Sequence, residues 1–283
     1  MIDLEHLRKW VGRTEQAEDV LTAWKTGAFA ALLDRDDHAP RAGDLLPPLW
    51  HWMLCVPYVR QSAIGPDGHA ARGGFLPPVP LPRRMWAGGR LEFLQPLRVG
   101  ETVTRRSEVA SVDHKSGRSG DLVFVLVKHE YSGAHGPAVR EEHDIVYRPL
   151  PDPAAPAPAP TPAPEGAQWE REIVPDSVLL FRYSALTFNG HRIHYDRRYV
   201  TEEEGYPGLV VHGPMIATML VDLLRRSMPH AKLARFEFRA MRPVFDVAPF
   251  RLCGRPATEP GKADLWVRDA DGYLAMQATA TLA

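Results

Sequence analysis

The side chains best suited to chemistry in this 283-residue sequence lie in one stretch, residues 181–224. Asn189 and His194 stand five residues apart in a polar loop between two stretches with helical periodicity. On a loop that leads into a helix, side chains at this spacing can converge on one small volume. An imidazole, with an unperturbed pKa of about 6.5, can take a proton from a water molecule that an amide holds in place. The sequence therefore predicts a proton-transfer site with Asn189 and His194 as its catalytic pair.

A long helix is predicted to begin directly after this loop, at the His-Gly-Pro turn of residues 212–214. Arg225 and Arg226 lie in its last turn, where cations suit the helix dipole. Backbone N–H groups at a helix start stabilise negative charge, so the N–H of Gly213 is a candidate oxyanion donor. The predicted buried face of the helix consists of Met215, Ile216, Met219, Leu220, Leu223 and Leu224.

A shorter helix is predicted in front of the loop. Asp176 suits the N-cap position, and Val178, Leu179 and Phe181 begin an apolar pattern with helical spacing. The pattern ends near Thr187, where Phe-Asn-Gly turns the chain. Two helices are therefore expected to hold the loop from both sides.

At these residues the sequence resembles the MaoC-like, (R)-specific enoyl-CoA hydratases and dehydratases, whose motif is Gly-Asp-x-Asn-Pro-x-His. The Asn-Gly-His-Arg-Ile-His-Tyr-Asp version is similar to the branch of mitochondrial 3-hydroxyacyl-thioester dehydratases and of bacterial hydratases of mesaconyl-C4-CoA (3-methylfumaryl-CoA) and itaconyl-CoA. Residues 75–108 and 143–148 extend the resemblance to the amino-terminal half. The motif positions are occupied here, in order, by Phe188, Asn189, His191, Arg192 and His194.

The resemblance implies an α+β double hot-dog fold, in which each of two domains wraps an antiparallel sheet around a long helix. It implies a hydro-lyase that reversibly adds water to an α,β-unsaturated acyl-CoA, and a C4-dicarboxylic thioester that becomes citramalyl-CoA is the first candidate. The alternatives are a 3-hydroxyacyl-thioester dehydratase of fatty-acid metabolism and a non-catalytic acyl-thioester-binding protein. No cofactor is expected.

The resemblance also suggests a role for each residue of the loop. His194 would act as the base, the N–H of Gly213 would bear the oxyanion, and Asn189 would either aim the water or only form the turn before Gly190. The second carboxylate of a dicarboxylic substrate needs a cation, for which Arg192 is the first candidate and Arg182 the second. The expected substrate-binding residues are Arg192, His191, Tyr195, His212 and Arg242.

No metal site is expected. His191, Arg192, His194 and Asp196 offer a His-x-x-His spacing, but no cysteine and no third strong ligand accompany it. His129, Glu130, His135 and His143 fit no tight zinc pattern and are predicted to be exposed polar positions.

Composition restricts the class of protein. The apolar fraction is 45%, the charged fraction 24% and the net charge −1, which is typical of a globular protein and argues against one that coats nucleic acid. The two cysteines, Cys55 and Cys253, suggest no disulfide framework. No signal peptide or apolar run of about 20 residues is evident, so no membrane span and a cytoplasmic location are expected. The expected partner is a coenzyme A thioester, and a homodimer is the candidate assembly.

The chain is predicted to divide into a degenerate hot-dog domain (1–148), a Pro/Ala linker (149–166) and a catalytic hot-dog domain (167–283). In the first domain, residues 1–35 are predicted to be helical, and Leu49–Val59 is predicted to be the buried central helix. Residues 85–90 are predicted to form a turn before a series of strands. Four strands are predicted in the second domain after its long helix, at Lys232–Met241, Pro249–Arg255, Ala263–Arg268 and Tyr273–Leu282.

Overall fold

A computed structural model describes residues 2–117, 120–150 and 159–283, so the centre of the Pro/Ala tract lies outside the described residues. Ten strands form one antiparallel sheet in the order β1-β3-β4-β5-β2-β7-β10-β9-β8-β6. The strands are β1 (Thr14–Val20), β2 (Arg83–Phe93), β3 (Thr102–Gly117), β4 (Gly120–Gly133), β5 (Gly136–Arg148), β6 (Trp169–Ile173), β7 (Leu233–Ala240), β8 (Phe250–Pro256), β9 (Lys262–Arg268) and β10 (Leu274–Leu282).

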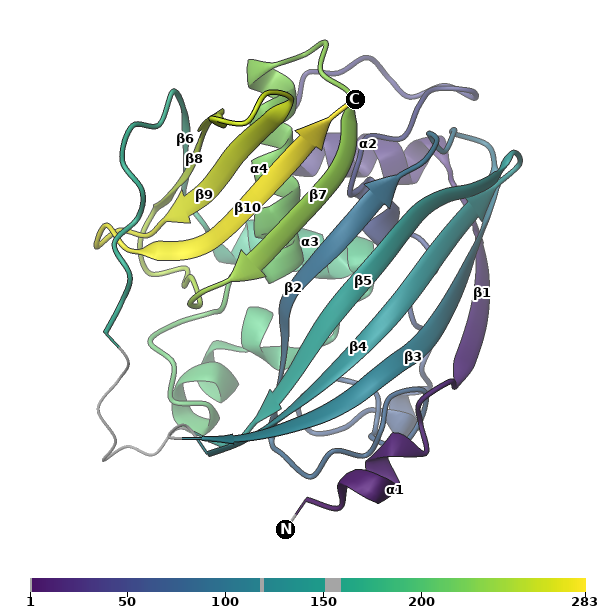
Figure 1. Cartoon of the computed structure of the whole chain (residues 1–283), viewed down its shortest axis with the longest axis vertical. Coiled ribbons are helices and arrows are strands. Elements are labelled where there is room, and N and C mark those ends of the chain that lie inside the picture. Colours follow the sequence, from purple (N-terminus) through teal and green to yellow (C-terminus); the bar gives the residue numbers. More distant parts are fainter. Residues whose placement is uncertain (1, 118–119, 151–158) are drawn as a thin grey trace.

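Helices α2, α3 and α4 lie behind the sheet in Figure 1, whereas α1 lies apart from them near the N-terminus and contacts β3. The α-helices are α1 (Leu4–Arg8), α2 (Ala23–Leu32), α3 (Ser177–Thr187) and α4 (Gly213–Ser227). Single turns of tighter or wider helix are η1 (Trp50–Met53), η2 (Gln61–Ala63), η3 (Arg192–His194) and η4 (Tyr199–Glu203). Helix α4 contacts β6, β8 and β9, and α2 packs against α3. None of the helices in the described ranges is long and apolar enough to cross a bilayer.

The two halves of the sheet meet where β2 pairs with β7, over the register from Gly88 opposite Arg239 to Glu92 opposite Arg235. A Cβ atom on Gly88 would lie 2.5 Å from the carbonyl oxygen of Phe238, so the absence of a side chain permits this close approach. The prediction of a turn at residues 85–90 is therefore wrong, because these residues belong to a strand that joins the halves.

The helices around the polar loop are confirmed. Asp176 caps α3 by accepting the N–H of Leu179 at 2.7 Å, and the helix ends at Thr187. Helix α4 begins at Gly213 with Pro214 in its first turn, and every residue from 215 to 224 is buried. The long helix is thus surrounded by protein on all sides.

The central helix predicted at Leu49–Val59 is wrong. Only the four residues of η1 are helical, and the flanking Leu49 and Cys55 have left-handed backbone angles of 70° and 53° in φ. Leu49 and Met53 are nevertheless completely buried. The apolar run therefore signalled burial rather than helix, and α2 is the longest helix of this half.

The prediction that residues 1–35 are helical is also wrong in part. Thr14–Val20 forms the edge strand β1, paired with β3 from Thr14 opposite Glu108 to Val20 opposite Thr102. Its side chains are mostly exposed, so it carries little of the apolar alternation by which strands are recognised.

Two histidines expected at the surface lie instead on the inner face of the sheet. The Nδ1 atom of His129 lies 2.9 Å from the hydroxyl of Ser107, and the ring of His143 lies 3.9 Å from that of Trp86. Burial lowers the pKa of His143 to about 3. His135 is exposed, as predicted.

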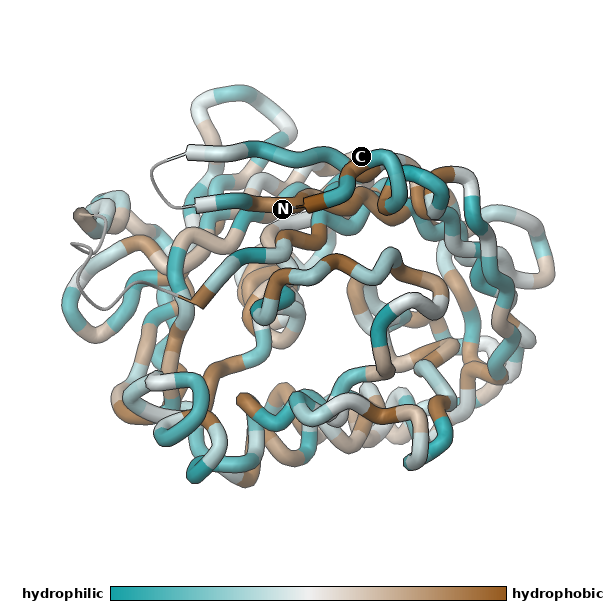
Figure 2. Tube along the Cα trace, turned by 90° about the horizontal axis from the view of Figure 1, so that it is seen from below, coloured by the Kyte–Doolittle hydropathy of each residue, from teal (hydrophilic) through white to brown (hydrophobic). Residues whose placement is uncertain are grey.

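The carboxy-terminal strands agree with their predicted positions to within one residue at most ends, whereas β6 was not predicted. Hydrophobic and hydrophilic residues succeed one another along much of the tube in Figure 2. The burial of β7 alternates in the same way, as expected of a strand with one covered face. Both cysteines are free and buried, so the expectation of no disulfide is confirmed.

One buried carboxylate connects three elements. The side chain of Asp222, on α4, is 0% exposed and lies 2.6 Å from Arg35, which follows α2, and 3.2 Å from Arg171 of β6. Arg226 lies 2.7 Å from the same carboxylate. The charges compensate one another, so the buried aspartate stabilises the packing of α4 only while its partners are present.

We expect Asp222→Asn to lower the free energy of unfolding by about 3 kcal/mol, because it leaves the arginines without a buried counter-ion. Asp37→Asn is the matched control, since Asp37 also pairs with Arg35 but at the surface, and should lower it by less than about 1 kcal/mol. Urea denaturation measures both variants. Equal losses would contradict the assigned role of the buried carboxylate.

Candidate active site

His194 lies in η3 and is buried. Its Nδ1 atom lies 2.7 Å from the carbonyl oxygen of Val210. A carbonyl oxygen only accepts, so Nδ1 carries the proton and Nε2 is left as an acceptor. Burial lowers the pKa of His194 to about 4, although the bond to Val210 opposes this shift. Near neutral pH the residue is therefore an uncharged base.

His212 holds this ring against the start of α4. The rings of His194 and His212 stack with centroids 3.7 Å apart and planes at 19°. The Nε2 atom of His212 lies 2.8 Å from the hydroxyl of Ser184, on α3. Because His212 is the N-cap residue of α4, the stack places His194 beside the first turn of that helix.

The space beside Gly213 is open. A Cβ atom added there would meet no atom within 4 Å. The N–H of Gly213 donates no hydrogen bond to any residue that the structure describes. A free N–H at a helix start next to open space can donate to a negatively charged oxygen.

Two buried polar atoms near the stacked rings also have no partner in the described part of the chain. They are the Nδ1 atom of His212 and the hydroxyl of Tyr183, whose ring lies 4.8 Å from that of His212. Buried polar atoms are normally satisfied by protein, water or ligand. Their presence here supports a ligand site between α3, α4 and the loop.

The other predicted residues of the loop are held in place by local contacts. The Oδ1 atom of Asn189 accepts the N–H of His191 at 3.0 Å, which is the turn contact that the Asn-Gly pair suggested. The hydroxyl of Tyr195 donates to the carbonyl of Gly190 at 3.0 Å, and its side chain is exposed. This turn contact occupies one of the two lone pairs of Oδ1, so the second lone pair and the Nδ2 group can still hold a water molecule.

Both of the arginines predicted to bind substrate already form an ion pair within the protein. Arg192 pairs with Asp196 at 2.8 Å and lies 4.0 Å over the ring of Tyr199. Arg242 pairs with Asp269 at 2.9 Å. Both guanidinium groups are thus already compensated by a carboxylate.

A loop of the amino-terminal half docks on the polar loop. The N–H of Arg192 donates to the carbonyl of Asp67 at 2.9 Å, and its side chain donates to the carbonyl of Pro66 at 3.0 Å. Gly68 meets Gly190 so closely that a Cβ on Gly68 would lie 1.9 Å from the carbonyl oxygen of Gly190. The two halves therefore build the site together.

This contact brings in two residues that sequence reasoning missed. The Nδ1 atom of His69 lies 3.0 Å from Asp67, and its ring lies 3.9 Å from that of His191. The rings of His191 and His194 are 5.4 Å apart, so histidines from both halves form a column. The only signal was the turn-like Gly-Pro-Asp-Gly before His69, which did not indicate its neighbours.

Burial lowers the pKa of both His69 and His191. Burial alone would raise the pKa of Asp67, but the hydrogen bond with His69 brings it below its ordinary value. Near neutral pH the column therefore holds an ionised carboxylate at one end and uncharged imidazoles along its length.

Asp67, His69 and His191 could also share a cation, since one ligand atom of each lies within 4.8 Å of the others. They would form a set of two histidines and one carboxylate, which suits a divalent transition metal. The aspartate is however already hydrogen-bonded to His69, and the two imidazole rings lie one over the other. The arrangement accounts for its own polar groups without an ion.

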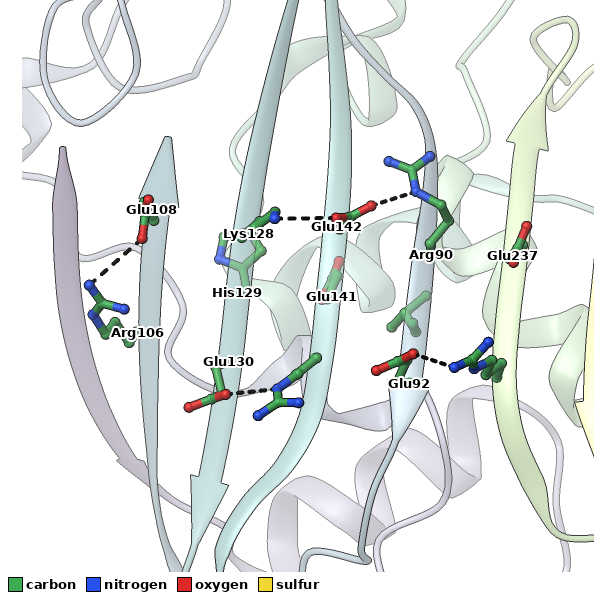
Figure 3. A pocket seen from close by; sticks show the side chains of 13 residues that line it. Arg90, Glu92, Arg106, Glu108, Lys128, His129, Glu130, Glu141, Glu142 and Glu237 are labelled. Atoms are coloured by element: carbon green, nitrogen blue, oxygen red, sulfur yellow. Dashed lines mark hydrogen bonds and ion pairs between the residues drawn. The ribbon is translucent and has the colours of Figure 1, made fainter. Parts of the chain in front are cut away.

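A surface hollow of about 470 Å³ lies elsewhere, over β2, β3, β4, β5 and β7. Figure 3 shows its charged side chains paired with one another, for example Arg90 with Glu142 and Arg140 with Glu130. None of the residues predicted for the site lines it.

Known proteins match most of this chain. A model of the hydroxyacyl-thioester dehydratase type 2 family matches residues 49–246. The mesaconyl-C(4)-CoA hydratase of Chloroflexus aurantiacus is 48% identical over 273 residues, which cover 96% of each chain. Among solved structures, a MaoC-like dehydratase from Phytophthora capsici superposes with a TM-score of 0.68 at 13% identity, covering 99% of this chain and 98% of that one.

A double hot-dog protein of Mycobacterium tuberculosis superposes with a TM-score of 0.59 at 14% identity, over 96% of each chain. The fold expected from the sequence is thereby confirmed, and the protein is a double hot-dog protein. Within that class, the chain belongs to the hydroxyacyl-thioester dehydratase type 2 family.

We expect Gly68→Ala to lower the free energy of unfolding by about 2 kcal/mol more than Gly43→Ala does, because its methyl group would overlap Gly190. Gly43 is the matched control, since both glycines have φ near +90° but a Cβ on Gly43 meets no atom within 4 Å. Urea denaturation compares the two variants. Equal losses would mean that the docked loop is not held tightly.

Proposed function

We propose that the protein is a hydro-lyase that reversibly adds water to an α,β-unsaturated acyl-CoA. The observation that carries this function is a buried, uncharged His194 with a free Nε2 atom, stacked beside the open start of α4. The 48% identity to a mesaconyl-C(4)-CoA hydratase supports the same reaction class.

In the hydration direction, Nε2 of His194 removes a proton from water as the water oxygen bonds to the β-carbon. The π electrons of the double bond move onto the thioester oxygen, where the N–H of Gly213 stabilises the negative charge. The α-carbon then takes a proton and the thioester is restored. The side-chain amide of Asn189 does not exchange protons near neutral pH, so Asn189 only orients the water and His194 carries the proton transfers in this scheme.

We further propose a C4-dicarboxylic substrate, with mesaconyl-C4-CoA first and itaconyl-CoA second, and citramalyl-CoA as the product. The inner face of the amino-terminal half carries the polar residues His129, Glu141 and His143. Polar lining favours a short charged acyl group over the apolar tunnel that a long 3-hydroxyacyl thioester requires. Dehydration of such a thioester, the activity in the family's description, is the second candidate because the same groups would run the reaction in reverse.

The domain division fits this function. We propose that residues 167–283 provide the base and the oxyanion donor, and that residues 1–148 cover the acyl group and dock Pro66–His69 on the polar loop. Residues 149–166 would connect the two. A homodimer and a cytoplasmic location remain predictions from the sequence.

We expect His194→Gln to reduce the hydration of mesaconyl-C4-CoA at least about 1,000-fold, because glutamine cannot accept the proton. Loss of the unsaturated-thioester absorbance measures the rate, with crotonyl-CoA and itaconyl-CoA as comparison substrates. His230→Gln is the control, since His230 is exposed and should leave the rate unchanged.

A thermal melt separates loss of catalysis from loss of folding. Wild-type turnover of none of the three thioesters would contradict the hydratase assignment and favour a non-catalytic thioester-binding protein. A folded His194→Gln variant with wild-type rates would remove His194 from the mechanism.

A further inference from the structure

A carboxylate on the substrate needs a cation inside the site, and this inference rests on the proposed function. In mesaconyl-C4-CoA the carboxylate is attached to the β-carbon, the atom that water attacks, so its counter-ion must lie close to the histidines. Arg192 pairs with Asp196, and Arg182 is exposed. The cation that binds the substrate carboxylate must therefore lie outside the polar loop and α3.

Arg84 lies on the inner face of the amino-terminal half. It belongs to β2 and stands opposite Tyr147 of β5. Trp86, two residues further along, has its side chain on the same face, because side chains alternate along a strand. Trp86 packs over His143 at 3.9 Å, which marks this face as the one that looks into the protein.

Arg84 has no counter-ion. It is partly buried, yet none of the carboxylates in the described ranges lies within 4.0 Å of its nitrogens. Its neighbour Arg83 points the other way and is fully satisfied by the carboxylate and carbonyl of Glu204. A partly buried, uncompensated cation is unfavourable until an anion joins it.

The positive charge of Arg84 acts on two histidines of the column, His69 and His191. Burial is the main cause of the lowered pKa of His69 and of His191, and the Arg84 guanidinium lowers both further. The Arg84 guanidinium also lowers the pKa of His143, for which burial is again the main cause. The loop that carries His69 is also tied to the start of β2, because the Arg72 guanidinium donates to the carbonyl of Pro82, two residues before Arg84, at 2.9 Å. Asp67 of the same loop is hydrogen-bonded to His69.

We propose that Arg84 binds the carboxylate on the β-carbon of the acyl group and thereby selects C4-dicarboxylic thioesters. A planar guanidinium can hold a carboxylate by two parallel hydrogen bonds. Neutralising this carboxylate also makes the adjacent β-carbon easier for the water oxygen to attack. Arg84 is thus a specificity-determining residue supplied by the half that lacks the catalytic base.

The test compares a charged and an uncharged thioester. Arg84→Met should lower kcat/KM for mesaconyl-C4-CoA at least about 100-fold, as expected for loss of one partner of a desolvated charge pair. Inhibition of the same reaction by crotonyl-CoA, which has no carboxylate, should change less than about threefold. Arg84→Lys keeps the charge and should recover about a tenth or more of the wild-type kcat/KM.

Arg148→Met is the matched control, since Arg148 stands opposite Arg83 and lies on the other face of the sheet. It should keep wild-type kinetics with both thioesters. A thermal melt of each variant identifies any that fails to fold. If Arg84→Met does not fold, Arg84→Lys replaces it, and it should lower kcat/KM for mesaconyl-C4-CoA without changing inhibition by crotonyl-CoA.

Equal weakening of mesaconyl-C4-CoA hydration and crotonyl-CoA inhibition in a folded Arg84→Met variant would overturn the proposal, as would unchanged kinetics. Failure of the proposed function is a different result, because the wild type itself would then hydrate neither thioester.

Discussion

The hydrogen bond from Nδ1 of His194 to the carbonyl of Val210 is the interaction on which the site depends. It fixes the tautomer, so that the proton-accepting nitrogen is Nε2, and it fixes the direction in which that nitrogen points. The stack on His212 then ties the ring to the first turn of α4. A base and a free backbone N–H are thus held in one place by two contacts within the carboxy-terminal half.

The amino-terminal half completes the site without supplying the base. Its sheet continues that of its partner half through β2 and β7, and glycine at position 88 lets the strands approach. Its Pro66–His69 loop lies on the polar loop, where Gly68 and Gly190 leave no room for a side chain. The two halves therefore contribute different parts: His194 and the start of α4 belong to the carboxy-terminal half, and the docked Pro66–His69 loop belongs to the amino-terminal half.

Sequence reasoning succeeded where local signals are strong. The Asp176 cap and the Phe-Asn-Gly turn define α3, and the Gly-Pro pair defines the start of α4. It failed at Leu49–Val59, where an apolar run is buried without being helical, and at β1, an exposed edge strand. The family motif led to His194, but Asp67 and His69 are distant in sequence, and only the folded chain brings them to the polar loop.

The most direct measurement of the central claim is a nitrogen-15 NMR titration of His194 from pH 3 to pH 8. Burial lowers the pKa of this residue to about 4, so the ring should stay uncharged down to about pH 5, with the proton on Nδ1 and none on Nε2. A midpoint near 4 with that tautomer is the predicted result. A midpoint near the ordinary value of about 6.5, or a proton on Nε2 at neutral pH, would contradict the assignment of His194 as the base.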